Sequence, residues 1–283
     1  MTNQVIDPAA APVPASSDGV VARVERGVGH LTLDRPRAIN ALDIGMVRRL
    51  AGALDAWERD PEVRAVVLDG AGERGLCAGG DVRELREQVL RGDAAATSRF
   101  FREEYALNAR IAEYPIPLVV LADGVTMGGG IGLAGHAGVR IVTERSRLAM
   151  PETRIGFTPD VGGSWLLARA PGRLGEYLAL TGAAMDAAAT AELLSELSPT
   201  ALTVTLAAVR RARELPGLRA ALAQEYGLVM WFAETQPDLA EGIRAQVVDK
   251  DRTPRWRPAD LALLAPGIVD EAFAHVPAVP LWE

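Results

Sequence analysis

Two glycine-rich turns of the sequence could present backbone amides to a ligand. CAGGD at residues 77–81 follows the hydrophobic run 66–69, and MGGGIG at residues 127–132 follows the run 118–123. Two N–H groups aimed at one point form an oxyanion hole, which stabilises negative charge on a carbonyl oxygen, and glycine lets the backbone approach a ligand closely. Either turn alone could equally be a chain reversal that only permits tight helix packing.

Two carboxylates follow these turns in a third segment. Glu152 comes directly after a proline in AMPETRIG, residues 149–156, and its other neighbours include apolar residues. Burial removes water from a carboxylate and raises its pKa, which makes it a stronger base. Glu152 is therefore a candidate base or nucleophile, although it could equally lie in a surface loop. Asp160, in PDVGG at 159–163, is a second candidate, or else the N-cap of a helix containing residues 165–168.

The composition excludes several other kinds of site. The 283 residues are 49% hydrophobic and 24% charged, with a net charge of -7, which argues against binding to the nucleic-acid backbone. The single cysteine, Cys77, excludes an internal disulfide and is expected to be a small buried residue. His30, His136 and His275 lie too far apart for metal-ligand spacing. We expect no metal, no nucleic-acid partner and a reducing, cytoplasmic location.

The beginning of the chain carries no recognisable targeting segment. Residues 1–18 are rich in alanine and proline and lack the basic and apolar runs of a signal peptide, so we expect a disordered tail. No stretch reaches the roughly 18 consecutive apolar residues that a membrane span requires. We therefore expect no membrane partner.

Strands and helices alternate through the first part of the chain. Strands are expected at 20–24 and 28–33, paired around Arg26 and Gly27, and buried strands at 65–68, 118–121 and 139–142. Asp43 is expected to cap a helix in which apolar residues recur at helical spacing before Pro61. Strands separated by helices imply βαβ units with right-handed crossovers.

Downstream of about Pro171 the strand signal stops. Helices are expected at 174–180, 199–213, 218–232 and 239–248. The sequence therefore predicts an α/β fold with three parts: a tail at 1–18, an α/β core at 19–182 and a helical C-terminal region at 183–283.

The motifs, taken together with their spacing, resemble the crotonase superfamily, also called the enoyl-CoA hydratase/isomerase family. The resemblance spans about residues 20–182 and rests on Arg35-Pro36, NAL at 40–42, CAGGD, MGGGIG and MPE at 150–152. It is closest to the 3-hydroxyisobutyryl-CoA hydrolase branch, whose usual motifs are similar to FFREEY at 100–105, GVTMGGG at 124–130, MPET at 150–153, PDVGG at 159–163 and EGIRA at 241–245.

This resemblance implies a crotonase-like spiral of ββα units with a helical C-terminal region, and an acyl-CoA substrate. It assigns the oxyanion-hole amides to Gly80 and Gly129, beside Gly79 and Gly128, the catalytic carboxylate to Glu152, and the wall of the acyl pocket to Glu104 and Asp160. It assigns the binding of the CoA phosphate groups to Arg35, Arg83, Lys250 and Arg252. A solvated surface role is an equal alternative for each of these four cations, and Glu104 could be a surface charge beside Glu103.

Position 132 distinguishes this sequence from the hydratases of the family that it resembles. Those enzymes use two glutamates to add water across a double bond, and Gly132 stands at the position of the first. The resemblance therefore implies hydrolysis of a short 3-hydroxyacyl-CoA, 3-hydroxyisobutyryl-CoA in valine degradation, with no cofactor beyond the CoA of the substrate. Glu152 would attack the thioester or activate water, and Asp160 would orient the water or bond the 3-hydroxyl group. A hydratase or isomerase of the same fold and a non-catalytic acyl-CoA-binding protein are the alternatives.

Two features of the C-terminal half stay open at this stage. Members of the superfamily usually carry a further strand and helical region between the turn at 180–182 and the helix at 198–202, where this sequence has only residues 183–197. Either the protein has lost this segment, or the protein contains the segment and the sequence as given omits it. The matching motifs on both sides favour the second explanation. Homo-oligomers are common in the superfamily, but the helical C-terminal region could instead cover the site of its own chain.

Overall fold

Seven strands form two sheets in the part of the chain that the computed structural model describes, residues 19–184 and 197–282. The strands are β1 (Val20–Glu25), β2 (Val28–Leu33), β3 (Ala65–Gly70), β4 (Leu118–Ala122), β5 (Val125–Met127), β6 (Val139–Val142) and β7 (Arg147–Ala149). The helices are α1 (Ile44–Glu58), α2 (Val82–Arg91), α3 (Ala94–Ala112), α4 (Gly129–Gly135), α5 (Gly163–Leu167), α6 (Leu174–Thr181), α7 (Pro199–Ala212), α8 (Leu218–Thr235), α9 (Pro237–Ile243) and α10 (Ile268–Ala274). Short 3-10 turns occupy Pro36–Ala38, Glu152–Ile155 and Leu261–Leu263, and a π-helix occupies Arg244–Val248.

The larger sheet has the strand order β1-β2-β3-β4-β6. β1 pairs antiparallel with β2, whereas β2, β3, β4 and β6 run parallel to one another. β5 and β7 form a separate parallel pair. Parallel neighbours require crossover connections, and helices provide several of them here. The predicted α/β class with a helical C-terminal region is confirmed.

The larger sheet packs on α1, α3 and α4 through a continuous apolar core. Successive side chains of a strand point to opposite faces, so alternate residues such as Leu31 and Leu33 of β2 are buried. Gly29 makes room for Trp57 of α1, since a β-carbon at Gly29 would lie 2.5 Å from the indole ring. Asp43 accepts a hydrogen bond from the Met46 amide at 2.9 Å, which confirms the predicted cap of α1.

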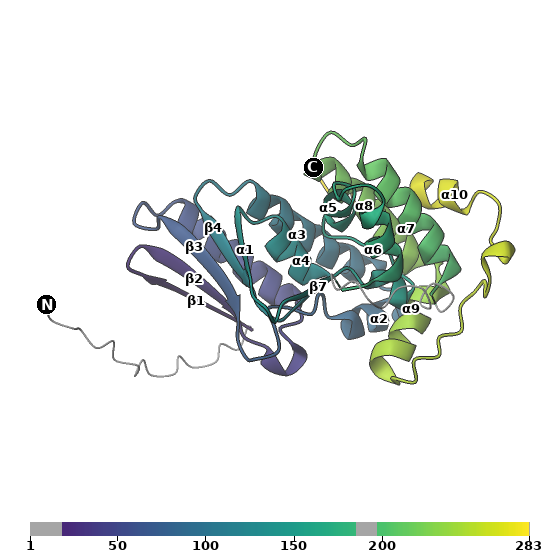
Figure 1. Cartoon of the computed structure of the whole chain (residues 1–283), viewed down its shortest axis with the longest axis horizontal. Coiled ribbons are helices and arrows are strands. Elements are labelled where there is room, and N and C mark those ends of the chain that lie inside the picture. The colour runs from purple at the N-terminus through teal and green to yellow at the C-terminus, as the bar shows by residue number, and fades with distance from the viewer. Residues whose placement is uncertain (1–18, 185–196, 283) are drawn as a thin grey trace, which may run out of the picture.

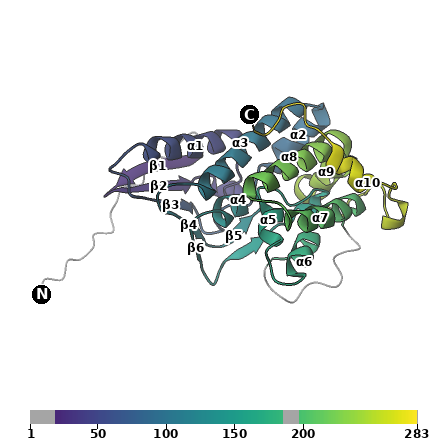
Figure 2. The same ribbon diagram turned by 90° about the horizontal axis from the view of Figure 1, so that it is seen from above.

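Figures 1 and 2 place the sheet at one end of the molecule and α5 to α10 at the other. A second apolar cluster fills the helical end, and α3 joins the two, because its Leu107 belongs to the first cluster and its Tyr105 to the second. α6, α7 and α8 confirm three of the predicted C-terminal helices. The fourth, predicted at 239–248, is divided, since α9 ends at Ile243 and the chain continues as the π-helix.

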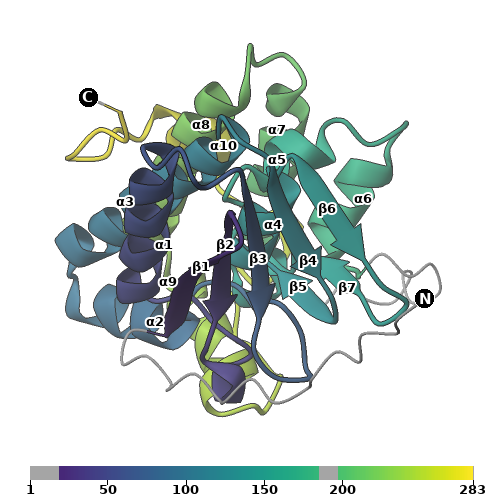
Figure 3. The same cartoon turned by 90° about the vertical axis from the view of Figure 1, so that its left-hand side faces the viewer.

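β6 differs from its prediction. Residues 139–142 were expected to form a buried strand, but Val139, Ile141 and Val142 are 45%, 46% and 59% exposed. Figure 3 shows β6 as the outer strand of the larger sheet. An edge strand has a neighbour on only one side, and an apolar run does not reveal this position in the sheet. β5 and β7 were not predicted, because three residues are too few for a periodic pattern.

Two predictions concern residues outside the described part. The tail at 1–18 lies wholly outside it, as do residues 185–196 of the stretch 183–197 in which a segment was expected to be missing. Among the described residues, no helix combines the length and apolarity needed to cross a membrane.

Asn40 anchors the first glycine-rich turn to the sheet. Its side-chain nitrogen lies within hydrogen-bond distance of the carbonyl oxygens of Ala71, Gly75 and Leu76, at 3.1, 3.2 and 3.0 Å. Its side-chain oxygen accepts a hydrogen bond from the Arg35 amide at 2.9 Å. Asn40 is fully buried and has a φ of 54°, a left-handed conformation that asparagine tolerates better than most residues. Its side chain therefore fixes the segment that leads into Gly79.

We predict that Asn40→Ala lowers the free energy of unfolding by about 2–4 kcal/mol, because it strands several buried backbone acceptors and strains a left-handed residue. Urea denaturation followed by circular dichroism measures this loss. Asp60→Ala serves as the control, since the Asp60 side chain accepts a single exposed hydrogen bond, from the Glu62 amide. Equal losses in the two variants would contradict the anchoring role of Asn40.

Candidate active site

The two glycine-rich turns lie side by side because backbone hydrogen bonds join them. The Cys77 amide donates to the Val125 carbonyl at 3.1 Å, and the Met127 amide donates to the Cys77 carbonyl at 2.9 Å. A β-carbon placed on Gly79 would lie 3.5 Å from the Gly129 nitrogen, and one on Gly129 would lie 3.3 Å from the Gly80 nitrogen. The Gly80 and Gly129 amides are thus neighbours, although 49 positions separate them in the sequence.

Both glycines line a cavity of about 270 Å³. In the described part of the chain neither of their amides donates a hydrogen bond to another group, so both amides remain available to a ligand. Gly79 and Gly128 have φ values of 105° and 49°, and the glycines leave little space, since a β-carbon on Gly129 would lie 2.6 Å from Glu104 Oε1. Two adjacent free amides beside a cavity have the geometry required of an oxyanion hole.

Glu152 lies inside this cavity and not in a surface loop. It begins the 3-10 turn Glu152–Ile155, is only 6% exposed, and its Oε2 atom has no hydrogen-bond partner among the described residues. A β-carbon on Gly128 would lie 3.0 Å from Glu152 Oε1, which places the carboxyl group beside the second glycine turn. Burial, and then the charge of Asp160, raise the pKa of Glu152 well above its ordinary value.

Asp160 lines the same cavity and does not cap a helix. The N-cap of α5 is Gly162, and no side-chain hydrogen bond from Asp160 supports it. Instead, the Tyr105 hydroxyl donates to Asp160 Oδ2 at 2.9 Å. Burial raises the pKa of Asp160 to about 7, and the Tyr105 hydrogen bond opposes this rise. Asp160 is therefore a carboxyl group that can exchange a proton near neutral pH.

Glu104 is the third carboxyl group of the cavity, and the structure separates it clearly from Glu103. Glu103 is paired with Arg48 at 2.6 Å on the surface, whereas Glu104 is 2% exposed and its Oε1 lacks a partner among the described residues. Burial, and then the charge of Asp160, raise the pKa of Glu104 well above its ordinary value. The alternative of a surface charge is thus wrong for Glu104.

The four predicted CoA-binding cations do not line the cavity. Arg35 is held within the protein by the Ala41 carbonyl at 2.6 Å and by Asp81 at 3.1 Å. Arg83 donates to the carbonyl of Val247, a residue of the cavity wall, at 3.0 Å. Lys250 and Arg252 are exposed and have φ values of 60° and 57°. Of the four, Arg83 and Arg35 each bond a residue of the wall, Val247 and Asp81 respectively.

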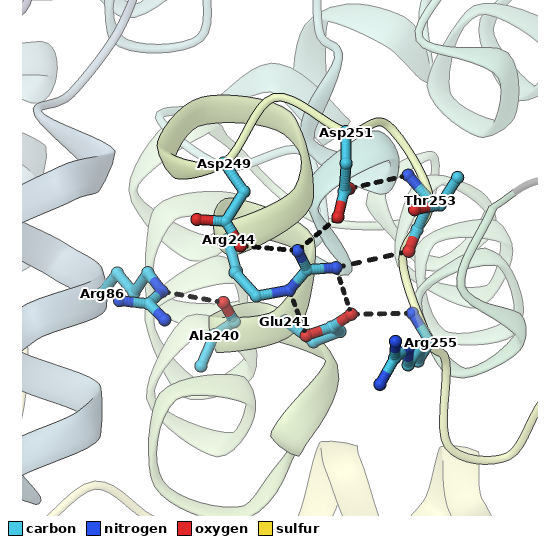
Figure 4. Close-up of polar contacts among 8 residues, drawn as sticks. All are labelled: Arg86, Ala240, Glu241, Arg244, Asp249, Asp251, Thr253 and Arg255. Atoms are coloured by element: carbon cyan, nitrogen blue, oxygen red, sulfur yellow. Dashed lines mark hydrogen bonds and ion pairs between the residues drawn. The ribbon is translucent and has the colours of Figure 1, made fainter.

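An ionic network supports that wall (Figure 4). Arg244, the first residue of the π-helix, donates to both oxygens of Glu241 at 2.8 Å and to Asp249 and Asp251 at 2.8 and 2.6 Å. The network closes the loop that carries Lys250 and Arg252 against the π-helix. That helix supplies Gln246 and Val247 to the cavity, so the loop and the wall are held together.

Gly132 lies behind the cavity in a place that is already filled. A β-carbon at this position would lie 2.7 Å from Asn108 Nδ2 and 2.8 Å from the Val161 β-carbon. Asn108 is fully buried, and neither atom of its side-chain amide has a hydrogen-bond partner among the described residues. The absence of a glutamate at position 132 is therefore accompanied by packing that leaves no room for one.

Several residues of the site were missed in the sequence. Phe100, Phe101 and Phe157 line the cavity, and Tyr105 supports Asp160. FFREEY offered a signal, because at helical spacing Phe101 and Tyr105 share a face with Glu104. No set of three or more His, Cys, Asp or Glu side chains in residues 19–184 and 197–282 is arranged to hold a metal ion.

The chain is similar to a known protein family and to individual proteins of known name. The family model described as enoyl-CoA hydratase/isomerase matches residues 28–193 and 184–273. The mitochondrial 3-hydroxyisobutyryl-CoA hydrolase of Rattus norvegicus is 33% identical, and the alignment covers 82% of this chain and 83% of that protein. The corresponding Xenopus tropicalis protein is 51% identical over 154 residues, which are 54% of this chain and 40% of that protein.

A solved structure is also similar over nearly the whole chain. The crystal structure of a carnitinyl-CoA dehydratase from Mycobacterium thermoresistibile has a TM-score of 0.86 and 40% sequence identity, and the match covers 94% of this chain and 98% of that chain. The rat alignment extends over 321 positions but spans only 82% of this chain, so many of its positions are gaps here. The family match divides at residues 184–193, within the stretch 183–197. The predicted division of the chain at residue 182 stays a prediction.

We predict that Gly132→Ala lowers the free energy of unfolding by about 1–3 kcal/mol, because the added methyl group must displace Asn108 or Val161 in a filled core. Chemical denaturation in urea measures the loss. Gly52→Ala on α1 is the matched control, since no atom lies within 4 Å of its new methyl group and the helix gains propensity. A Gly132→Ala variant as stable as wild type would show that the site has room for a side chain.

Proposed function

Because the chain belongs to the enoyl-CoA hydratase/isomerase family, we propose that it hydrolyses a short 3-hydroxyacyl-CoA thioester, 3-hydroxyisobutyryl-CoA, to 3-hydroxyisobutyrate and CoA. The observation that carries this proposal is the position of Glu152, a buried carboxyl group with an unpartnered oxygen beside the free amides of Gly80 and Gly129. The names of the rat and Xenopus tropicalis relatives point to the same reaction.

Hydrolysis begins with the thioester oxygen between the two glycine amides. As the carbonyl carbon becomes tetrahedral, negative charge gathers on this oxygen, and each amide lowers the barrier by about 3–4 kcal/mol. Either Glu152 attacks the carbonyl carbon, CoA leaves as a thiolate and water opens the mixed anhydride, or Glu152 takes a proton from water, which attacks directly. Both routes need Glu152 in its ionised form.

Asp160 and Glu104 face the acyl part of the substrate in this proposal. Asp160 orients the attacking water or accepts a hydrogen bond from the 3-hydroxyl group, and Glu104 completes the polar side of the cavity. Phe100, Phe101 and Phe157 supply the apolar side. A site whose buried polar groups depend on a substrate hydroxyl rejects acyl groups that lack it, because those groups are then left unpaired.

The CoA moiety extends past the π-helix in this proposal, toward the arginine and lysine side chains that surround it. Arg83 already contacts the Val247 carbonyl of the cavity wall, and Lys250 and Arg252 lie on the loop that Arg244 holds. Arg35 fits this role less well, since Asp81 and Asp43 lie 3.1 and 3.3 Å from its guanidinium nitrogens. We keep it as a residue that shapes the first glycine turn.

We further propose that the reaction belongs to valine degradation and needs no cofactor beyond the CoA of its substrate, since carboxylate and amides supply the chemistry described above. We propose a cytoplasmic location without a nucleic-acid or membrane partner, although the rat relative is named as mitochondrial. Association with further copies of the chain is part of the same proposal, and light scattering of the purified protein would decide it.

Two other functions compete with hydrolysis. The solved structure named a carnitinyl-CoA dehydratase favours water elimination or addition on the same fold, but the crowded position 132 speaks against a second glutamate there. A non-catalytic acyl-CoA-binding protein would share the cavity and use none of its carboxyl groups for chemistry.

We predict that the purified protein releases free thiol from 3-hydroxyisobutyryl-CoA and that Glu152→Gln lowers kcat by about 10²–10⁴-fold, because the base or nucleophile is lost. A thiol reagent follows CoA release, and calorimetry shows whether the variant still binds the substrate. Glu103→Gln is the matched control, since Glu103 is an ion-paired surface glutamate next to Glu104 on α3.

Three results would refute this function. Hydration of crotonyl-CoA without thiol release would identify a hydratase. Binding of the thioester without turnover by wild-type protein would identify a binding protein. Equal kcat values in wild type and Glu152→Gln would remove Glu152 from the mechanism.

We predict that kcat/KM falls as the pH is lowered through about 7. This pH is well above the ordinary pKa of a carboxyl group. Burial raises the pKa of Asp160 to about 7, so Asp160 gains a proton as the pH falls through this value and no longer orients the water as a carboxylate. Burial also raises the pKa of Glu152 well above its ordinary value, so Glu152 loses its charge at a higher pH than an ordinary glutamate does. Asp160→Asn removes a charge that raises the pKa of Glu152, so the acidic limb of its profile moves to lower pH. A rate that stays constant down to pH 5 would contradict this prediction.

A further inference from the structure

The turn that carries Asp160 is conformationally strained. Val161 has a φ of 52°, which is unfavourable for a β-branched residue, and Gly162 follows with a φ of 80°. Such a conformation costs about 1–3 kcal/mol and persists only where surrounding contacts enforce it. The Gly163 amide donates to the Asp160 carbonyl at 2.6 Å, which closes the turn. The direction of the Asp160 side chain therefore depends on whatever holds residues 161–164.

Glu225 of α8 holds the far side of this turn. Its Oε2 accepts a hydrogen bond from the Gly162 amide at 2.5 Å, and its Oε1 accepts from the Ser164 amide at 2.9 Å and from the Ser164 hydroxyl at 2.5 Å. Glu225 is fully buried, and no described cation pairs with it. Three donors from two residues thus meet one carboxyl group that comes from 61 positions further along the chain.

His136 also contacts this turn, through the Val161 carbonyl group. Its Nε2 lies 2.8 Å from the Val161 carbonyl oxygen, which can only accept a hydrogen bond, so Nε2 carries the proton. Burial lowers the pKa of His136, which keeps the ring neutral. A β-carbon on Gly162 would lie 2.3 Å from this nitrogen, so the ring and the turn are in tight contact.

We propose that Glu225 is a positioning residue for Asp160: by accepting the Gly162 and Ser164 hydrogen bonds it enforces the strained turn that aims the Asp160 carboxyl group into the cavity. The inference rests on the proposed function only in that Asp160 takes part in it. Burying a carboxylate without a cation costs several kcal/mol, which is more than the stability that a side-chain cap adds to a short helix. Capping alone therefore does not account for Glu225. The three donors stabilise the ionised form of Glu225, because only an ionised group accepts at both oxygens without presenting a proton.

Glu225 also acts on the charges of the cavity. The groups that interact with Asp160 are Tyr105 and Glu104 from α3, Glu152 from its 3-10 turn and Glu225 from α8, and His136 at the end of α4 contacts the next residue, Val161. Burial raises the pKa of Glu225 to about 8, and the hydrogen bonds from Ser164 and Gly162 oppose this rise. In its ionised form Glu225 adds to the raised pKa of Glu152, after burial and the charge of Asp160.

A double-mutant cycle between Glu225→Gln and Asp160→Asn tests the proposal in the full chain. With 3-hydroxyisobutyryl-CoA, Glu225→Gln is expected to lower kcat by about 10–100-fold and to change KM by less than about threefold, because Asp160 is misplaced while binding is retained. In the Asp160→Asn background the same change is expected to cost less than about threefold.

Asp238→Asn is the matched control. Asp238 is an equally buried carboxylate that accepts from the Ser198 hydroxyl at 2.6 Å and the Arg257 amide at 2.7 Å, outside the cavity. It is expected to lose stability without the loss of kcat. An unchanged kcat in Glu225→Gln, or an equal loss in both backgrounds of the cycle, overturns the positioning role. Should Glu225→Gln not fold, Ser164→Ala removes one donor and enters the same cycle.

Hydrogen exchange separates this inference from the proposed function. In Glu225→Gln the amides of Gly162 and Ser164 are expected to exchange at least about tenfold faster than in wild type, and those of α1 at an unchanged rate. A wild type inactive on the thioester, together with faster exchange at these amides, would refute the function and leave the turn support standing. Unchanged exchange would refute the turn support whatever the activity.

Discussion

The site depends on one constraint: four carboxyl groups are buried close together, and none of them has a cationic partner among the described residues. Glu104, Glu152, Asp160 and Glu225 are each at most 6% exposed. An arginine or lysine beside them would stabilise their ionised forms and lower their pKa values, which would make them weaker bases. The fold supports two of them with neutral donors: the Tyr105 hydroxyl bonds Asp160, and the amides at the start of α5 bond Glu225. Neutral donors hold Asp160 and Glu225 in place without a cation that would lower their pKa values.

Burying carboxyl groups without cations lowers the stability of the fold, and contacts elsewhere must offset this loss. Several kcal/mol are needed to bury each carboxyl group, and the left-handed Val161 adds to them. The two apolar clusters supply the compensating stability, and α3 passes through both. Because α3 also carries Glu104 and Tyr105, the helix that joins the sheet to the helical end fixes two of the groups on which the cavity depends.

The sequence predicted the features that are written locally. The cap of α1 at Asp43, the paired strands before it and the glycine turns each follow from neighbouring residues, and Glu152 was identified from its proline and its apolar surroundings. Glu225 could not be found in this way, because α8 has an ordinary helical pattern and the residues that Glu225 contacts lie more than 60 positions away. The exposure of β6 was missed for a related reason, since position within a sheet is decided by pairing and not by composition.

Packing around Gly132 links the chemistry to the fold. A single substitution could not convert this cavity into one with two opposed glutamates, since Asn108 of α3 and Val161 of the strained turn already occupy the space. Val161 adopts its conformation because Glu225 and His136 hold the residues around it. The turn that aims Asp160 into the cavity therefore also fills the position where a second glutamate would stand. One strained turn therefore provides the carboxyl group of Asp160 and excludes a glutamate at position 132. The presence of the first carboxyl group and the absence of the second have the same structural cause.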